Sequence, residues 1–218
     1  RAYTLPHLPM FISIEGPDGS GKTTQAVLLT ERLKAAGARA LYVREPGGTP
    51  AGEELRRILK SGGDISPRTE LLLFEAARAE IVDKVIRPAL ARGEVVVADR
   101  FSDSSVAYQA YGRGLPGDVV RRLNAFATSG LTPGLTFLLD LPQDVAKART
   151  SDRDAGVALP RRFEIEPAEF HRRVSNGYRA LAAAEPERWR VIDASRPPET
   201  IASDIWAHVA ASLGLRAP

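Results

Sequence analysis

The sequence predicts an α/β fold of three layers, in which a central five-stranded parallel sheet is flanked by helices. Short β-rich runs alternate along the chain with amphipathic stretches, which is typical of βαβ units whose parallel sheet is covered on both faces. A chain of 218 residues, 44% of them hydrophobic, can bury one full core but is short for two. We therefore expect one domain over residues 10–218. Residues 1–9 lack a periodic pattern and contain two prolines, so we expect an N-terminal extension there.

The individual elements follow from local hydrophobic patterns, taken in chain order. The β-rich runs are the predicted strands: Met10–Ile14, Ala40–Val43, Val95–Ala98, Leu135–Leu139 and Arg190–Ile192. The amphipathic stretches are the predicted helices: Gly21–Ala36, Ala51–Leu59, Arg68–Ala91, Gly117–Ala127, Pro142–Ala148, Pro167–Ala183 and Pro198–Leu213. The segment Thr150–Pro160 is polar and irregular, and we expect it to belong to a lid at about residues 149–163.

Composition narrows the classes of function. The chain has no cysteine, which excludes disulfide scaffolds, zinc–cysteine sites and thiol chemistry. The net charge of +3 comes from 30 basic and 27 acidic residues that are intermixed, so we expect neither nucleic acid nor a membrane as a partner. No apolar run is long enough to cross a bilayer and no signal-peptide pattern opens the sequence, so we expect a cytoplasmic protein.

A glycine-rich turn follows the first predicted strand and leads into the first predicted helix. Its residues Gly16, Gly21, Lys22 and Thr23 fit the pattern G-x-x-x-x-G-K-[ST]. Glycines let the backbone curl so that successive N–H groups, with the positive end of the helix, surround a phosphate. Lys22 would then reach the β- and γ-phosphates of ATP, and Thr23 would reach a Mg²⁺ ion. The pattern indicates a P-loop NTPase fold, with these ATP-binding residues: Gly16, Asp18, Gly19, Ser20, Gly21, Lys22, Thr23 and Thr24.

A second carboxylate is expected to help organise the metal. Asp99 stands at the carboxyl end of a predicted buried strand, where open α/β sheets bind ligands, so Thr23 and Asp99 are the candidate metal residues. Capping of the next helix is the alternative role for Asp99. Three classes of P-loop protein fit at this stage: a small-molecule kinase, a GTPase and an ATPase motor or binding module. The guanine-reading N-K-x-D motif is absent, and motors generally need a larger chain.

Three further segments carry a resemblance to a known family. The segments "REPGG" from Arg44, "LFEAAR" from Leu73 and "DRFSDSSVAYQ" from Asp99 closely resemble the thymidylate kinase family. The resemblance spans Phe11 to about Ala194, and it implies that ATP, with Mg²⁺, phosphorylates dTMP to dTDP without a covalent enzyme intermediate. It also implies a homodimer. The runner-up function is another deoxynucleoside monophosphate or nucleoside kinase on the same scaffold, and a non-catalytic nucleotide-binding module is a more distant alternative.

The resemblance implies a second substrate site. Phe74 would stack on thymine and Arg78, four positions along the same helix, would donate to its O4. Arg100 and Arg56 would grip the dTMP phosphate, and Tyr108 would exclude a 2′-hydroxyl. Plain core packing of both aromatic side chains and solvation of Arg56 are the alternatives. The full implied dTMP set is Asp18, Arg44, Arg56, Phe74, Arg78, Arg100, Ser104, Ser105, Tyr108 and Gln109.

The sequence departs from one branch of the family at Gly19, where that branch has an arginine that contacts the triphosphate. We expect a lid arginine to supply this charge, since phosphoryl transfer relies on positioning and electrostatics. The candidates are Arg149, Arg153, Arg161 and Arg162. Arg161 replaces an aspartate of the family's D-R-[FI]-E pattern, which leaves the choice among them open. Our choice is Arg153, so that the expected catalytic residues are Lys22, Asp99, Arg100 and Arg153.

Overall fold

The computed structural model describes residues 10–60, 64–154, 163 and 165–214, with only the backbone described for residues 151–154. A single parallel sheet of five strands lies at its centre, in the order β2-β3-β1-β4-β5. The strands are β1 (Met10–Glu15), β2 (Ala40–Arg44), β3 (Val95–Asp99), β4 (Leu135–Asp140) and β5 (Trp189–Asp193). All five predicted strands are therefore confirmed, each with its end shifted by no more than one or two residues.

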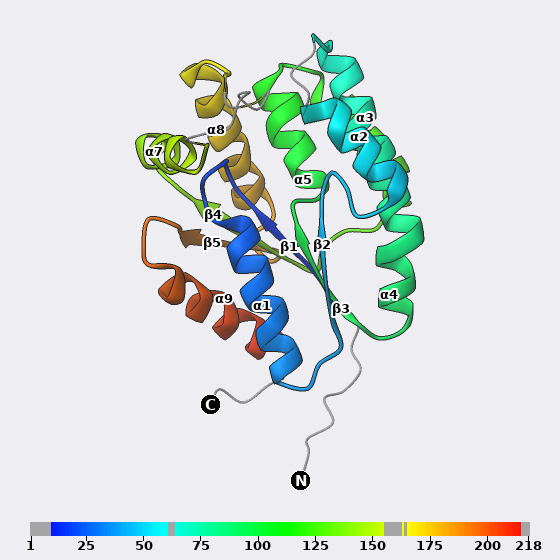
Figure 1. The fold of residues 1–218 in the computed structure, drawn as a ribbon, viewed down its shortest axis with the longest axis vertical. Coiled ribbons are helices and arrows are strands. Elements are labelled where there is room, and N and C mark those ends of the chain that lie inside the picture. The colour runs from blue at the N-terminus through cyan, green and yellow to red at the C-terminus, as the bar shows by residue number, and fades with distance from the viewer. Residues whose placement is uncertain (1–9, 61–63, 155–162, 164, 215–218) are drawn as a thin grey trace.

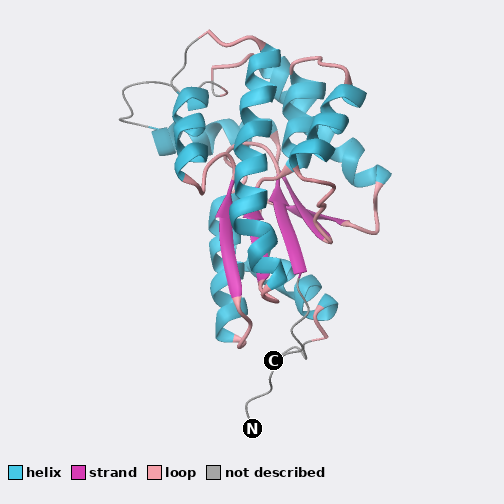
Figure 2. Ribbon diagram, turned by 90° about the vertical axis from the view of Figure 1, so that its right-hand side faces the viewer, coloured by secondary structure: helices cyan, strands magenta, loops and turns pink. Residues whose placement is uncertain are grey.

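The strand register brings functional residues to one edge of the sheet. Ile14 of β1 and Arg44 of β2 are both paired with Asp99 of β3. Because all strands run in the same direction, their carboxyl ends lie together, and Figure 2 shows the arrowheads pointing toward the part of the molecule where most helices gather. Ligands of open α/β sheets bind at this edge.

Helices cover both faces of the sheet and complete the three layers (Figure 1). The helical segments are α1 (Lys22–Ala35), α2 (Pro50–Lys60), α3 (Pro67–Ile81), η1 (Val82–Ile86), α4 (Arg87–Ala91), α5 (Ser102–Ser105), η2 (Val106–Gly112), α6 (Gly117–Ala127), α7 (Gln143–Asp154), α8 (Ala168–Ala184) and α9 (Pro198–Ser212). On one face α1 and α9 pack on Ile12 and Ile14, whereas on the other the α3–α4 stretch packs on Phe11. Because these side chains alternate between two layers of helices, β1 is buried on both faces, and its two polar residues, Ser13 and Glu15, are buried with it.

Two expectations about the helices were wrong. The sequence pattern shows no helix between Ser102 and Gly112, yet α5 and η2 fill this range. Most of these residues are buried, so the segment has no polar face and lacks the period that marks an amphipathic helix. The helix predicted to end at Ala148 continues as α7 to Asp154, so the first residues of the expected irregular insert are helical.

The predicted helix Arg68–Ala91 is present as three consecutive segments, α3, η1 and α4, with π-helical geometry in the middle. Ser66 caps its start by accepting a hydrogen bond from the Thr69 N–H. None of the helices in the described ranges is long and apolar enough to cross a membrane.

Candidate functional site

The phosphate loop connects β1 to α1 at the carboxyl edge of the sheet. Gly21, the N-cap of α1, has φ +89°, and Gly16 has φ +143°, conformations that favour glycine. A Cβ at Gly16 would also lie 2.6 Å from the Leu139 carbonyl oxygen. The loop therefore needs glycine at these two positions for its shape, and the shape presents the N-terminus of α1 to the cavity.

Lys22 is folded into this loop. Its ammonium group donates to the Pro17 carbonyl oxygen at 2.6 Å, and the residue is 7% exposed. Burial and the nearby Arg100 guanidinium lower the pKa of Lys22 to about 8, although Asp18 and Asp99 act in the opposite direction. An anion bound in the loop would raise this pKa again and favour the charged form of Lys22.

Thr23 and Asp99 meet at the base of the cavity. The Thr23 hydroxyl donates to the Asp99 carboxylate, so the first residues of α1 and the end of β3 are joined by their side chains. A hydroxyl beside a carboxylate provides two hard oxygen ligands, the type that Mg²⁺ prefers. In the described part of the chain no group of three His, Cys, Asp or Glu side chains could hold a metal by itself. A metal here would therefore also need oxygens from a nucleotide or water.

Arg100 follows Asp99 and lies at the centre of the site. Its backbone φ of +72° is uncommon for a residue other than glycine. One terminal nitrogen, Nη2, donates to Asp18 at 2.6 Å and to the Tyr108 hydroxyl at 3.1 Å, and the other donates to the Gly16 carbonyl oxygen at 3.1 Å. Burial would raise the pKa of Asp18, but Arg100 and Lys22 hold it well below its usual range. The phosphate loop and the end of strand β3 are thus connected by a partly buried ion pair.

A cavity of about 520 Å³ extends from the phosphate loop across Arg100 to the helices α3 and η2. Most of the predicted site residues line it: Asp18, Gly19, Gly21, Lys22, Thr23, Thr24, Arg44, Arg56, Phe74, Asp99, Arg100, Ser104, Ser105, Tyr108, Gln109 and Arg149. The predicted nucleotide-binding residues Gly16 and Ser20 belong to the loop but do not line the cavity. The two halves predicted from different segments therefore share one space.

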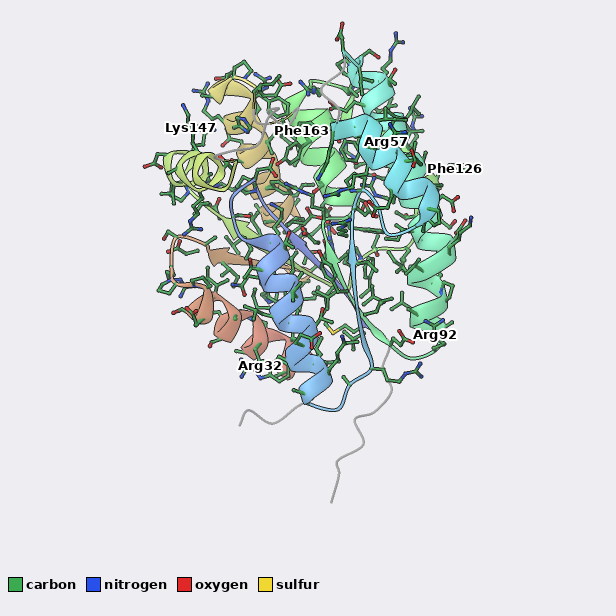
Figure 3. The ribbon with its side chains drawn as sticks, in the orientation of Figure 1. Arg32, Arg57, Arg92, Phe126, Lys147 and Phe163 are labelled. Atoms are coloured by element: carbon green, nitrogen blue, oxygen red, sulfur yellow. The ribbon has the colours of Figure 1, made fainter. Side chains whose placement is uncertain are left out.

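Aromatic side chains form the half of the cavity far from the phosphate loop. Phe74 and Phe163 both line it, with ring centroids 6.2 Å apart. The Tyr108 ring meets Phe163 edge to face at 5.3 Å. Gln109 donates to the buried carboxylate of Glu70 at 3.0 Å, which fixes the direction of its amide. Figure 3 shows Phe163 near the N-terminal part of α8. A flat apolar ligand fits between walls of this kind.

Arg78 does not line the cavity. It is 1% exposed and lies behind the wall, where it donates to Glu45 at 2.9 Å and to Glu75 at 2.8 Å. It also donates to the Ser105 hydroxyl and to Asn124. Burial raises the pKa of Glu45 to about 7, against the opposing effect of Arg78. The contact between Arg78 and a base therefore stays a prediction, while its place in a buried ion cluster is clear.

The remaining arginines lie around the cavity. Arg44 pairs with Glu53 at 3.2 Å, Arg56 donates to the Pro46 carbonyl oxygen at 2.6 Å, and Arg149 donates to the Ala194 carbonyl oxygen at 2.9 Å. The side chain of Arg153, on α7, and the residues Arg161 and Arg162 lie outside what the structure describes.

Gly19 lies against α7. Its φ is +80°, and a Cβ there would lie 2.7 Å from the Ala146 carbonyl oxygen. A side chain at this position would be both strained and crowded, so the arginine of the other branch has no room in this arrangement.

The sequence did not reveal several residues that build the site. Glu15 and Tyr178 are fully buried and lie beside Arg100, while Tyr42, Glu45 and Phe163 line the cavity. A glutamate in an otherwise apolar strand was the one available signal for Glu15, because an acidic residue is almost never fully buried unless its carboxylate is paired.

The site has the parts of a P-loop kinase that acts on a nucleotide. These parts are a phosphate loop, a hydroxyl–carboxylate pair for a metal, and an arginine between the loop and an aromatic pocket. The family model described as thymidylate kinase matches residues 14–205. The thymidylate kinase of Synechococcus sp. (strain JA-2-3B'a(2-13)) is 53% identical over 206 residues, covering 94% of this chain and 97% of its own. The thymidylate kinase of Thermomicrobium roseum is 50% identical over 210 residues, covering 95% and 99%. That of Deinococcus radiodurans is 48% identical over 201 residues, covering 92% and 96%. The chain belongs to the thymidylate kinase family, whose enzymes use ATP to phosphorylate dTMP to dTDP.

Proposed function

We propose that ATP and dTMP occupy the two halves of the one cavity, with the transferring phosphoryl group between Lys22 and Arg100. The observation that supports this most directly is the continuity of the space: a cavity of about 520 Å³ is lined by the phosphate loop at one end and by Phe74 at the other. The residues of both halves face the same volume, so an in-line transfer needs no covalent enzyme intermediate.

On the donor side, the N–H groups of the loop and Lys22 would hold the triphosphate of ATP. Lys22 donates to the Pro17 carbonyl oxygen in the structure, and it would exchange this acceptor for phosphate oxygens. Thr23 and Asp99 would hold a Mg²⁺ ion together with phosphate oxygens and water. An ion held by Thr23 and Asp99 would supply positive charge beside the phosphates of ATP.

On the acceptor side, Phe74 would stack on the thymine ring while Arg100 holds the phosphate of dTMP. Arg100 lines the cavity, and its guanidinium is already oriented by Asp18 and Tyr108. The Tyr108 ring is fixed by its contact with Phe163, so it would occupy the space of a 2′-hydroxyl and select deoxyribose. Arg44 and Arg56 would add positive charge near the same phosphate.

Charge on the transferring group would be completed by an arginine from α7 or the segment that follows it. This proposal is supported by Gly19, where neither the backbone conformation nor the space beside Ala146 admits an arginine in the loop itself. Arg153 is our choice, and Arg149 is the alternative whose side chain lines the cavity. An arginine that supplies charge in phosphoryl transfer contributes a factor of about 10³–10⁵ in rate.

The acceptor preference is tested by a coupled assay of ADP release with dTMP, dUMP, dCMP, AMP, GMP and thymidine. We expect dTMP to give the highest kcat/KM and thymidine to give no turnover, because it lacks the phosphate that Arg100 would hold. The Lys22→Ala variant, assayed in parallel, controls for contaminating kinases. Equal turnover of dTMP and a purine monophosphate would contradict the proposed use of the aromatic half.

We also propose that a second copy of the chain covers the outer face of α3 and α6. These helices pack against each other and expose Leu72, which is 56% exposed, and Phe126, which is 85% exposed. Figure 3 shows Phe126 at the outer edge of the molecule. Side chains of this size are seldom so exposed together on a surface without a partner.

A cytoplasmic location stays a prediction of the sequence.

Light scattering after gel filtration tests the dimer. We expect twice the chain mass for the unaltered protein and the single chain mass for Phe126→Asp. Val191→Asp, which places the same charge at an apolar side chain 57% exposed on the edge strand β5, should keep the dimer mass. A monomer at micromolar concentration in the unaltered protein would refute the proposal.

A further inference from the structure

Glu15, the last residue of β1, is a buried carboxylate without a role in the reaction as described so far. It is 0% exposed, and its side chain points to the same face of the sheet as Phe11, toward α5 and α8. One oxygen, Oε1, accepts from the Ser13 hydroxyl at 2.9 Å and from the Phe101 N–H at 2.7 Å. The other, Oε2, accepts from the Ser104 hydroxyl at 2.6 Å and the Tyr178 hydroxyl at 3.1 Å.

These four hydrogen bonds match the acceptor capacity of an ionised Glu15 carboxylate. An ionised carboxylate accepts about four hydrogen bonds, and a protonated one would have to use one of these positions to donate. Of the groups that face Glu15, the Phe101 N–H can only donate, and the hydroxyls of Ser13, Ser104 and Tyr178 can donate to it. Burial raises the pKa of Glu15, as does the charge of Asp103, while Ser104 and Arg100 lower it. The positive charge of Arg100 lies immediately beyond the two hydroxyls.

The same two hydroxyls accept hydrogen bonds from Arg100. Its Nη1 atom lies 3.0 Å from the Tyr178 oxygen and 3.1 Å from the Ser104 oxygen. The Ser104 and Tyr178 oxygens also lie 2.8 Å apart, so one of these hydroxyls can donate to the other. A hydroxyl that donates to Glu15 leaves its oxygen lone pairs to face the guanidinium. The pKa of the Tyr178 hydroxyl is raised well above its usual value by burial and by Glu15, so this group keeps its proton. Glu15 thus sets the direction of two groups that hold Nη1.

This arrangement divides the guanidinium of Arg100 into two ends. Nη1 is held at the back by Tyr178, Ser104 and the Gly16 carbonyl oxygen. Nη2 faces Asp18 and Tyr108, both of which line the cavity. The left-handed φ of +72° at Arg100 is a local strain that the surrounding contacts must support. A planar guanidinium whose Nη1 is held by hydrogen bonds presents its Nη2 to a ligand in a fixed plane.

We propose that Glu15 and Tyr178 are positioning residues for phosphoryl transfer, which act through the Tyr178 and Ser104 hydroxyls to fix the plane of the Arg100 guanidinium toward the acceptor phosphate. The inference rests on the proposed contact between Arg100 and dTMP. It assigns a role in acceptor binding to α8, whose Tyr178 lies 163 positions from Glu15 in the sequence.

The test begins with Tyr178→Phe, which removes only the hydroxyl and keeps the ring packed against Tyr108. A hydrogen bond to a charged group is worth about a tenfold to hundredfold factor. We therefore expect kcat/KM for dTMP to fall by about tenfold or more, while the KM for ATP and the melting temperature stay close to those of the unaltered enzyme. Tyr111→Phe is the matched control. Tyr111 belongs to η2 and is 41% exposed, so the loss of its hydroxyl should change neither constant.

A double-mutant cycle separates positioning from a general structural role. If Tyr178 acts through Arg100, then Tyr178→Phe should change dTMP binding, measured by calorimetry, by less than twofold in an Arg100→Ala background. Glu15→Gln provides a second variant. The side-chain nitrogen of glutamine donates hydrogen bonds, so a hydroxyl beside it would have to accept and would turn its own hydrogen toward Arg100. This variant should reproduce the selective loss for dTMP.

The kinetics of the Tyr178 variant test the positioning role, whereas dTMP binding by Arg100→Ala tests the contact between Arg100 and the acceptor phosphate. Unaltered kinetics of Tyr178→Phe, or an equal loss with and without Arg100, would overturn the positioning role. A loss that affects ATP and dTMP equally, with a lower melting temperature, would also overturn it by identifying Tyr178 as core only. If Arg100→Ala itself binds dTMP normally, it is the proposed contact between Arg100 and the acceptor phosphate that fails.

Discussion

The buried ammonium group of Lys22 makes ATP binding depend on pH in a range where most lysines are fully charged. Burial and Arg100 lower its pKa to about 8, whereas an ordinary lysine titrates near pH 10.4. At pH 7 about nine-tenths of such a group is charged, and at pH 9 only about one-tenth is. Since a triphosphate needs the charged form, the affinity for ATP should fall about tenfold between pH 7 and pH 9. An unperturbed lysine would give a change of only a few per cent.

Isothermal titration calorimetry measures this effect directly. We expect the ATP dissociation constant of the unaltered enzyme to rise about tenfold from pH 7 to pH 9, with uptake of about 0.9 proton per ATP at pH 9. The uptake is obtained by comparing two buffers with different ionisation enthalpies. Lys22→Arg keeps a permanent charge and should remove the part of both effects that comes from residue 22. Lys34→Arg, at an exposed position near the other end of α1, should leave both effects unchanged.

A second titrating group in the cavity has to be separated from Lys22. The pKa of Glu45 is raised to about 7 by burial, so it ionises near the lower end of the same range. Its contribution remains in the Lys22→Arg variant and can be subtracted. A dissociation constant that is flat from pH 7 to pH 9 in the unaltered enzyme, with no proton uptake, would refute the argument that burial shifts Lys22.

The other predictions concern side chains with different burial. Phe74→Ala should raise the KM for dTMP by about 5- to 150-fold and leave that for ATP unchanged, because stacking a base on an aromatic ring is worth about 1–3 kcal/mol; equal damage to both constants with a lower melting temperature would identify Phe74 as core. Arg78→Met should cost about 3–5 kcal/mol, or about 6–20 °C in melting temperature, since two buried carboxylates lose their partner; thermal stability within 2 °C of the unaltered enzyme would contradict the ion cluster. Arg153→Ala should lower kcat by at least about a hundredfold with modest changes in either KM. Normal turnover of this variant would show that another arginine supplies the charge in the transition state.

Much of the fold follows from local patterns in the sequence. The phosphate loop is a contiguous motif, and its glycines at positions 16 and 21 adopt positive φ values, which fits the curled backbone expected of it. The five strands are apolar runs between amphipathic stretches, so their places along the chain could be predicted. The segment from Asp99 to Gln109 indicates the substrate although its hydrophobic pattern does not predict its helices. The identities of its residues carry the resemblance to the family, and this does not depend on a helical period.

What the sequence could not decide is which side chains meet. Arg78 is four positions from Phe74 on one helix, and helix geometry alone cannot tell that its guanidinium lies between Glu45 and Glu75 behind the cavity wall. Glu15, Tyr178 and Arg100 come from three distant segments and meet only because β1, β3 and α8 pack together. Local periodicity reports whether a side chain is buried, whereas its partners depend on how the strands are ordered and how the helices cross them. The sequence by itself determined the chemistry at each end of the cavity, and the tertiary structure decided how the arginine between them is held.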